Sequence, residues 1–250
     1  MEWNILHLEE IDSTNTEVRR QSQQGALQGF VISAEKQTAG KGRRGRSWES
    51  PAGNNLYFSI LLRPEVELAK TPMLTLIMAY SVARAIEQLE DMQPKIKWPN
   101  DLILSGKKIC GILTEMHISE GHIEDVIIGT GMNVNVTDFP EELADKATSL
   151  YLETGKKIDR EALLNTVLAE FGKQYERFLE VQDLSYLQEE YNQRLINKDR
   201  EVLVLEPGNE YQAVAQGINS AGELLVQKED GSVETVFAGE VSVRGIYGYV

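Results

Sequence analysis

The stretch KIKWPNDLILSGKKICGILTEMHI (residues 95–118) decides the fold of this chain, because it contains two apolar runs separated by a tight turn. The turn falls at Ser-Gly 105–106, and a second one at Glu-Gly 120–121 leads into a third run, HIEDVIIGTGMNVNV (122–136). Glycine-containing turns between short apolar runs are typical of antiparallel β-hairpins. The sequence therefore predicts three consecutive antiparallel strands here.

Further strands and several helices surround these hairpins. Apolar or alternating segments predict strands at 3–10, 29–36 and 55–64. Helical patterns cover 12–25, 73–89, a long segment that begins at Asp159, and 184–195. Thr14 and Glu17 have the spacing of a capping box, which predicts the start of the first helix. Helices that accompany an antiparallel sheet indicate the α+β class.

After Asn197 the pattern changes to short strands. Turn pairs that contain glycine separate them at 207–208, 221–222 and 230–231. This texture predicts a small all-β barrel. The sequence therefore divides into a larger domain, residues 1–197, and a C-terminal barrel, residues 198–250.

Composition limits the class of protein. The chain has 250 residues, 42% of them hydrophobic, which is ordinary for a globular protein with a sizeable core. Its formal net charge of −14 argues against general binding to DNA, whose phosphates it would repel. Cys110 is the only cysteine, so no intramolecular disulfide can form. We find no secretory signal and no run of about 18 apolar residues, and we expect a cytoplasmic protein without a membrane span.

The densest positive charge lies in QTAGKGRRGRSW (37–48), which has four cations, three glycines and no acid. Its GKGRRG core matches the glycine pattern of dinucleotide-binding loops, but Pro51 and the paired asparagines that follow cannot open the helix such a site needs. No P-loop pattern occurs. The segment is either a solvated basic loop, a contact for nucleic acid, or a mobile clamp that closes on a phosphate or carboxylate.

Three other stretches carry polar groups suited to a ligand. The corner KWPND (97–101) is followed by Lys108 at the start of an apolar strand, where an unpaired ammonium would be costly to bury. The alternative is a lysine at the end of the hairpin that stays in water. DSTNTE (12–17) begins a helix, whose free N–H groups could bind a polar ligand; the alternative is that the segment only caps the helix. The glycines of GTGMN (129–133) allow close approach to the backbone, and Asn133 could bind a base or ribose.

In this order and spacing, the four stretches resemble the motifs of the biotin–protein ligases: a glycine/arginine loop, a KWPND corner with a downstream lysine, and a G-x-G-x-N strand. The resemblance extends over essentially the whole chain. It implies a class II synthetase-like mixed sheet with flanking helices, and a C-terminal SH3-like β-barrel. The chain starts at the first catalytic strand, so it is similar to the ligase-only members without a helix-turn-helix. We therefore expect no DNA partner.

The resemblance also implies a reaction in two steps. Biotin and ATP, with Mg²⁺, give biotinyl-5′-adenylate and pyrophosphate; a lysine of a biotin carboxyl carrier protein domain then accepts the biotinyl group. The first step joins a carboxylate to an α-phosphate, and cations at the developing charge assist such a step. We expect phosphates and water to hold the magnesium ion, so no protein metal ligand is named.

Matching motif positions imply roles for individual residues. Lys108 and Arg43 are the expected catalytic cations. The expected biotin-binding residues are Ser13, Thr14, Asn15, Gln37, Gly40, Lys41, Gly42, Arg43, Lys108 and Gly111. The expected contacts to ATP or the adenylate are Arg43, Arg46, Trp48, Asn100, Asn133 and Arg244, with Glu240 as a further candidate. Lys41 stands where the family loop commonly has arginine; lysine lacks the planar fork, so we expect a looser hold on the adenylate.

Other functions fit parts of the sequence. A lipoate or octanoate ligase or transferase of related fold could use Cys110 as an acyl carrier, although no histidine stands within a few positions to activate it. A non-enzymatic nucleic-acid binder could use the basic loop with Trp48, but the net charge opposes this. Edge strands of the main sheet could pair two copies into a homodimer. The sequence does not indicate which carrier protein is the acceptor.

Overall fold

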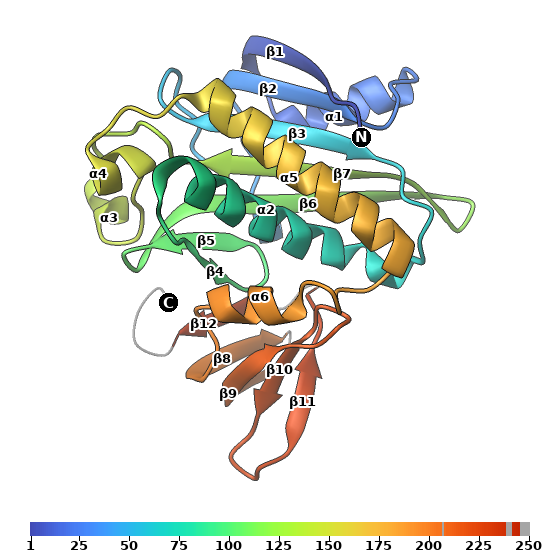
Figure 1. The fold of residues 1–250 in the computed structure, drawn as a ribbon, viewed down its shortest axis with the longest axis vertical. Coiled ribbons are helices and arrows are strands. Elements are labelled where there is room, and N and C mark those ends of the chain that lie inside the picture. Colours follow the sequence, from blue (N-terminus) through green and yellow to red (C-terminus); the bar gives the residue numbers. More distant parts are fainter. Residues whose placement is uncertain (207, 239–241, 246–250) are drawn as a thin grey trace.

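The computed structural model of the chain describes residues 1–206, 208–238 and 242–245 (Figure 1). Its larger sheet has seven strands in the order β1-β2-β3-β7-β6-β5-β4. Their bounds are β1 Asn4–Ile11, β2 Phe30–Gln37, β3 Leu56–Leu62, β4 Lys95–Lys97, β5 Asp101–Leu104, β6 Lys107–Ser119 and β7 His122–Met132. β1 and β2 pair in parallel and the other neighbours pair antiparallel, so the expected mixed sheet is confirmed.

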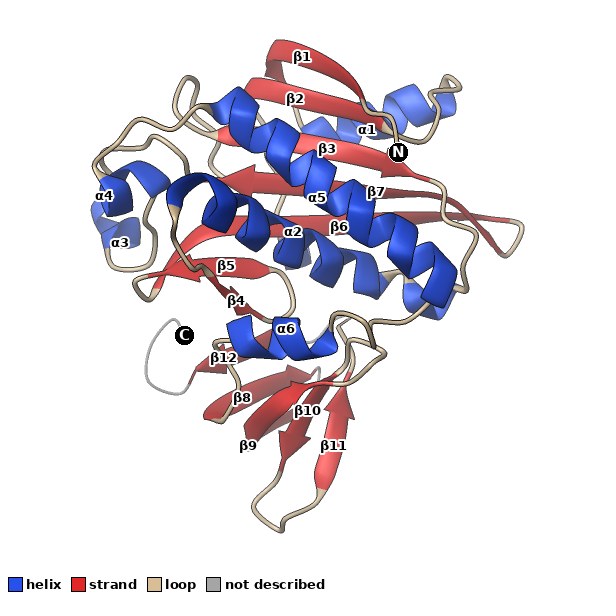
Figure 2. Cartoon of the chain, in the orientation of Figure 1, coloured by secondary structure: helices blue, strands red, loops and turns tan. Residues whose placement is uncertain are grey.

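Helices cover both faces of this sheet. α2 and α5 lie side by side across one face, and α1 packs on the other (Figure 2). The helix bounds are α1 Thr14–Gln23, α2 Pro72–Glu90, α3 Glu141–Ala144, α4 Leu150–Thr154, α5 Arg160–Val181 and α6 Gln188–Arg194, with short 3-10 turns η1 Arg43–Gly45 and η2 Leu68–Lys70. The sequence predicted neither α3 nor α4.

Strand β3 explains why the sheet needs covering on both sides. All seven of its residues are buried, because alternate side chains point to opposite faces and both faces carry helices. Phe58 and Ile60 belong to the large core beneath α2 and α5. Leu61 packs instead with Val18 of α1 in a smaller core on the opposite face. The ligand-binding elements described below lie on this second face.

The first helix starts differently from the sequence prediction. Ser13 is the N-cap, with φ −156° and ψ 135°, and Thr14 is already helical, so the predicted Thr14–Glu17 capping box is wrong. The reason is tertiary: both the N–H and the hydroxyl of Thr14 donate to Oε1 of Gln37 on β2, at 2.9 and 3.1 Å. A side chain from the neighbouring strand therefore satisfies a donor that the local cap was expected to satisfy.

The KWPND stretch forms the expected corner. It separates β4 from β5, and the Trp98–Pro99 bond is cis. The two short strands pair antiparallel, with Lys97 opposite Asp101. The corner thereby turns the chain back and brings Asn100 and Asp101 alongside β6.

The C-terminal part forms a second, five-stranded antiparallel sheet, as the barrel prediction implied. The strand order is β11-β10-β9-β8-β12. The bounds are β8 Arg200–Glu206, β9 Asn209–Ile218, β10 Leu224–Gln227, β11 Val233–Val236 and β12 Ser242–Gly245. Helix α6 lies between the two sheets (Figure 1) and contacts both β4 and β9. The chain passes from α6 to β8 between residues 194 and 200; the exact division at 197 remains a prediction.

Candidate active site

A pocket opens on the α1 face of the large sheet, where the glycine-rich loop meets the centres of β6 and β7. Its cavity measures about 60 Å³. The predicted site residues that line it are Ser13, Thr14, Asn15, Gln37, Lys41, Gly42, Arg43, Trp48, Asn100, Lys108 and Gly111. Gly129, Thr130 and Gly131 line it as well, so residues from all four stretches share one pocket.

Lys108 lies inside this pocket, at the start of β6. Its Nζ forms an ion pair with Oδ1 of Asp101 at 2.6 Å and lies 5.1 Å from the ring centroid of Trp48. Only 22% of the side chain is exposed. The alternative of a hairpin lysine in open water therefore does not describe this structure. A carboxylate and an aromatic face stabilise an ammonium that has left bulk water.

Arg43 supplies the second cation, from the turn η1 in the glycine-rich loop. Its Nη1 donates to Oδ1 of Asn100 at 3.0 Å, and its Nη2 donates to the carbonyl of Ala238 at 3.2 Å. Burial lowers the pKa of the Arg43 guanidinium, while the charge of Asp101 opposes that shift. The guanidinium of arginine nevertheless stays protonated in proteins. The contact with Ala238 also connects the loop to the C-terminal part of the chain.

The floor of the pocket is a hydrogen-bonded group at the start of α1. Gln37 accepts from Thr14 and donates through Nε2 to Oγ of Ser50 at 2.8 Å. Ser59 Oγ lies 2.7 Å from Oγ1 of Thr14 and 2.6 Å from Oδ1 of Asn15. Thr14, Asn15, Ser50 and Ser59 are buried and Gln37 is partly buried. The hydrogen bonds between these side chains join different elements and fix their orientation. Such a rigid polar group can select a ligand by its pattern of donors and acceptors.

Glycines make room for Trp48 above the sheet. A Cβ at Gly111 would lie 3.0 Å from the indole, and one at Gly131 would lie 2.6 Å from it. The ring therefore rests directly on the backbone of β6 and β7. Trp48 both covers the pocket and contacts Lys108, as expected for a residue that closes a site.

A second cavity of about 210 Å³ adjoins the pocket. Arg43, Asn100 and Ile112 line both cavities. Its other walls come from the start of α2, including Pro72, and from Ala238. Arg43 thus borders both cavities, and a cation in that place suits a ligand with two parts and an anionic group between them.

Three predicted site residues, Gly40, Arg46 and Asn133, are not among the described residues that line the pocket. Gly40 lies behind it, packed against the Trp48 carbonyl, and Arg46 is exposed. The amide of Asn133 donates to the carbonyl of Thr148 at 3.2 Å. Arg244 pairs through its backbone with Leu203 on β8. The Arg244 side chain and the whole of Glu240 lie outside the described residues, so their predicted contacts stay untested.

The structure adds polar residues that sequence reasoning did not assign to the site. Asp101 is the partner of Lys108, and it stands within the quoted KWPND motif. Ser59 interrupts the apolar run of β3, and Glu115 is a charged residue in β6. Ser59 and Glu115 both contact Asn15. A polar side chain inside an otherwise apolar strand is the signal that could have identified them.

Comparisons with known proteins agree with this arrangement. Residues 8–133 match the Biotin/lipoate A/B protein ligase family, and residues 199–244 match the Biotin protein ligase C terminal domain. The bifunctional ligase/repressor BirA of Bacillus subtilis is 36% identical over 244 residues, which cover 96% of this chain and 74% of that protein. The chain belongs to the biotin protein ligase family.

Two solved structures and a further sequence relative resemble the ligase over most of its length. The biotin protein ligase of Aquifex aeolicus, in complex with biotin and ATP, superimposes with a TM-score of 0.85 at 33% identity, covering 97% of this chain and 99% of that one. The Leishmania major enzyme with biotinyl-5-AMP gives 0.62 at 28% identity, covering 93% and 98%. The Mycobacterium tuberculosis biotin–[acetyl-CoA-carboxylase] ligase is 30% identical over 92% of this chain and 85% of its own.

Two remaining features of the ligase lie outside the pocket. Cys110 is fully buried in β6, and burial raises the pKa of its thiol far above the ordinary value. None of the helices in the described part of the ligase combines the length and apolar character that a transmembrane helix requires.

Proposed function

We propose that this chain activates biotin with ATP to form biotinyl-5′-adenylate and then transfers the biotinyl group to a lysine of a biotin carboxyl carrier protein domain. One observation carries the proposal: Lys108 and Arg43, from two different elements, converge on one pocket between glycine-lined strands and an aromatic cover. Two cations at one point suit a reaction that joins two anions.

In the first step, a carboxylate oxygen of biotin attacks the α-phosphorus of ATP. A new phosphorus–oxygen bond forms, the bond to the β-phosphate breaks, and pyrophosphate leaves. Lys108 would hold the carboxylate and an α-phosphate oxygen together, and Arg43 would stabilise the charge that develops on the phosphate. Removing one such donor typically slows a reaction about 10²–10³-fold.

In the second step, the amine of an acceptor lysine attacks the carbonyl carbon of the mixed anhydride. An amide bond forms, AMP leaves with the electrons of the broken anhydride bond, and the amine releases a proton. The adenylate hydrolyses readily, so water must be excluded until the acceptor arrives. A cavity of about 60 Å³ is far smaller than the several hundred Å³ usual for ligand pockets, so the loop with Trp48 has to move when ligands bind.

Magnesium is proposed as the companion of ATP and is given no protein ligand. Among the described residues, no group of three or more His, Cys, Asp or Glu side chains could hold a metal ion. Asp101, the carboxylate nearest the two cations, is already paired with Lys108. We name no protein ligand for the magnesium ion and assign no step to one.

The alternative of a lipoate or octanoate transferase is not favoured. Its acyl carrier would be Cys110, which burial holds as a neutral thiol inside the core of the sheet. A thiol of raised pKa without access to the pocket is a poor nucleophile. We further propose that the protein is located in the cytoplasm and that it does not bind operator DNA. We also propose that edge strands of the main sheet pair two copies into a homodimer.

The proposed function is tested by incubating the chain with ATP, magnesium and a purified biotin carboxyl carrier domain, then measuring the intact mass of the carrier. We expect addition of one biotinyl group that requires the acceptor lysine, and no comparable addition from lipoate or octanoate. A carrier that gains lipoyl or octanoyl groups but no biotin would contradict the proposal.

A further inference from the structure

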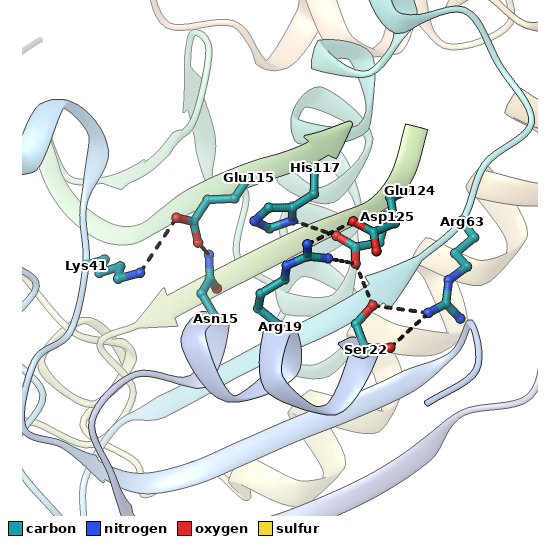
Figure 3. A network of polar contacts seen from close by, with 9 residues as sticks. All are labelled: Asn15, Arg19, Ser22, Lys41, Arg63, Glu115, His117, Glu124 and Asp125. Carbon is teal, nitrogen blue, oxygen red and sulfur yellow. Dashed lines mark hydrogen bonds and ion pairs between the residues drawn. The ribbon is translucent and has the colours of Figure 1, made fainter. Parts of the chain in front are cut away.

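A polar seam runs between α1 and the β6–β7 hairpin, beside the pocket (Figure 3). The helix contributes Asn15, Arg19 and Ser22, which are spaced to lie along one side. The strands contribute the residues that face them, among them Glu115 on β6 and Asp125 on β7. Only one end of this seam, at Asn15 and Glu115, reaches the pocket and its loop.

We propose that Glu115 is a positioning residue for biotin: one of its carboxylate oxygens fixes the orientation of the Asn15 amide, and the other competes with the phosphate of the adenylate for Lys41. This inference rests on the proposed function. It gives a role to a side chain that the sequence motifs did not include.

The first half of the inference concerns Asn15. Its Nδ2 donates to Oε2 of Glu115 at 2.6 Å, and its Oδ1 lies 2.6 Å from Oγ of Ser59. A serine hydroxyl can donate or accept, so Ser59 would tolerate either orientation of the amide. An ionised carboxylate can only accept. Glu115 therefore decides which end of the amide faces β6, together with a longer contact to the Leu113 carbonyl at 3.4 Å.

A fixed amide matters because Asn15 lines the pocket and is only 4% exposed. An amide that flips would present a donor where the ligand needs an acceptor, or the reverse. The ureido ring of biotin carries both donors and an acceptor, so such an error would weaken binding. Orientation by Glu115 affects binding of biotin before any chemistry takes place.

The second half concerns Lys41. Its Nζ lies 3.8 Å from Oε1 of Glu115, with 47% of the lysine and 33% of the glutamate side chain exposed. A partly exposed pair at this distance is weak and screened by salt. It can hold the start of the loop near the pocket floor and still release Lys41 to another anion. The phosphate of a bound adenylate would therefore compete with Glu115 for the same ammonium.

The rest of the seam holds α1 in place without Glu115. Asp125 is fully buried and accepts from Arg19 Nη1 at 2.6 Å and from Ser22 Oγ at 2.5 Å. His117 Nδ1 lies 2.6 Å from the other oxygen of Asp125. Because these contacts anchor the helix, variants of Glu115 should fold, and changes in binding can be assigned to the pocket.

The test uses two variants that separate the two roles. Glu115→Gln removes the charge near Lys41 but keeps a carbonyl oxygen that can accept from Asn15, and the Leu113 carbonyl, which can only accept, still disfavours the flipped amide. Glu115→Ala removes both the charge and the side-chain acceptor. Glu124→Gln is the matched control, since it makes the same change in charge at the outer end of the seam, where Glu124 pairs with Arg19. Biotin binding is measured by calorimetry, KM and kcat by carrier biotinylation, and adenylate release by stopped flow.

For Glu115→Ala we expect the Kd and KM for biotin to rise about tenfold, the cost of one charge-assisted hydrogen bond, with kcat within about twofold. For Glu115→Gln we expect biotin affinity within about twofold of wild type and adenylate release about threefold slower, because Lys41 loses its competitor. The slower release should vanish when Lys41→Met is added. Glu124→Gln should match wild type throughout.

Two results would overturn the inference. Equal effects of the alanine and glutamine variants on biotin affinity would mean that the amide orientation is not the cause. Unchanged affinity in Glu115→Ala would mean that Glu115 does not act on the pocket. A wild-type chain that binds no biotin would overturn the proposed function as well, which distinguishes that failure from failure of the inference alone.

Discussion

Single residues in the pocket are paired so that cations stay in place before an anion arrives. Lys108 is held by Asp101 and by the face of Trp48, and Arg43 is held by Asn100 and a carbonyl. Leaving either charge buried without partners would cost several kcal/mol. The partners therefore stabilise a site that is organised in advance for two anionic substrates.

Cys110 provides a prediction at this scale. Cys110→Ala should retain most of the biotinylation rate. The thiol is fully buried, and its raised pKa keeps it neutral, so it is not expected to act as a nucleophile. Only stability should fall, by about 1 kcal/mol for a small change in core volume. Carrier biotinylation and a thermal melt measure the two effects. An abolished rate in a folded variant would favour covalent acyl transfer through the thiol.

Sequence reasoning reached the site residues mainly through the family resemblance. The position of Lys108 at the start of an apolar strand left open whether it serves a ligand or stays in water, and only the family resemblance implied a catalytic role. Asp101, its partner, was not assigned because the register that brings β5 beside β6 includes a β-bulge, which the sequence does not reveal. Asn133 was assigned to the nucleotide from its motif, but its amide bonds to Thr148, on a segment whose path was not predicted.

At the scale of elements, strand alternation decides which residues reach the pocket. Gly129 lies directly beneath Asn15: a Cβ there would be 2.0 Å from the Asn15 Oδ1. Side chains two residues apart on a strand share a face, so Gly129 and Gly131 open the same surface. The two glycines let α1 and Trp48 approach the sheet.

Gly129→Ala should therefore displace Asn15 and lower biotin affinity at least about tenfold, measured by calorimetry, because a buried hydrogen-bonding group loses its place. Gly172→Ala in α5 is the matched control. Its Cβ would meet nothing closer than 3.7 Å, and alanine favours helix over glycine, so activity should not change. Biotin affinity in Gly129→Ala equal to wild type would contradict the close packing of α1 on β7.

The glycine-rich loop is the element expected to move. Its backbone has a few bonds of its own, from Gly42 N–H to the Arg46 carbonyl at 2.7 Å and from Trp48 N–H to the Gly40 carbonyl at 2.9 Å. The sequence predicts disorder of 37–48 without ligand and order with the adenylate, and this remains a prediction. It follows from the glycines and from the need to admit ligands.

Limited trypsin digestion tests the loop. Cleavage after its four cations should slow at least about fivefold when biotin and ATP are present, because a closed loop cannot enter the protease. The exposed pair at 156–157, before α5, serves as the internal control and should be cut at the same rate in both states. Equal cleavage of the loop with and without ligands would argue against closure.

Most of the longer helices and strands were predictable from the sequence. The long helices α2 and α5 and the strands β2, β3, β6 and β7 follow from their apolar periodicity. The start of α1 was wrong because Gln37, from another strand, satisfies its first N–H group. Local patterns cannot anticipate a partner that tertiary structure brings in.

Across the whole molecule, the second sheet is attached to the first beside the active site. Trp98 is almost fully buried, its backbone N–H donates to Asn197 and its indole Nε1 donates to the carbonyl of Gly222 at 3.1 Å. The loop reaches the same region through Arg43 and Ala238. The change to short strands after Asn197 predicted the two domains. It could not predict the contacts between them, because these depend on tertiary packing.

Trp98→Phe should lower the melting temperature by about 4–8 °C. The variant loses one buried hydrogen bond and some packing, together about 2 kcal/mol, in a chain of this size. Trp3→Phe, at a half-buried ring packed on Phe171, is the control and should shift the melt less. A larger shift for Trp3→Phe than for Trp98→Phe would contradict the importance of this junction.

The central claim, that Lys108 offsets the repulsion between two anions, is tested most directly by biotin-dependent ATP–pyrophosphate exchange. Wild type should exchange with biotin and not with lipoate or octanoate. Lys108→Ala should lose exchange about 10²–10³-fold, whereas Lys107→Ala, whose ammonium bonds to the Ala144 carbonyl outside the pocket, should stay within about twofold. Exchange in Lys108→Ala at the wild-type rate would contradict the account.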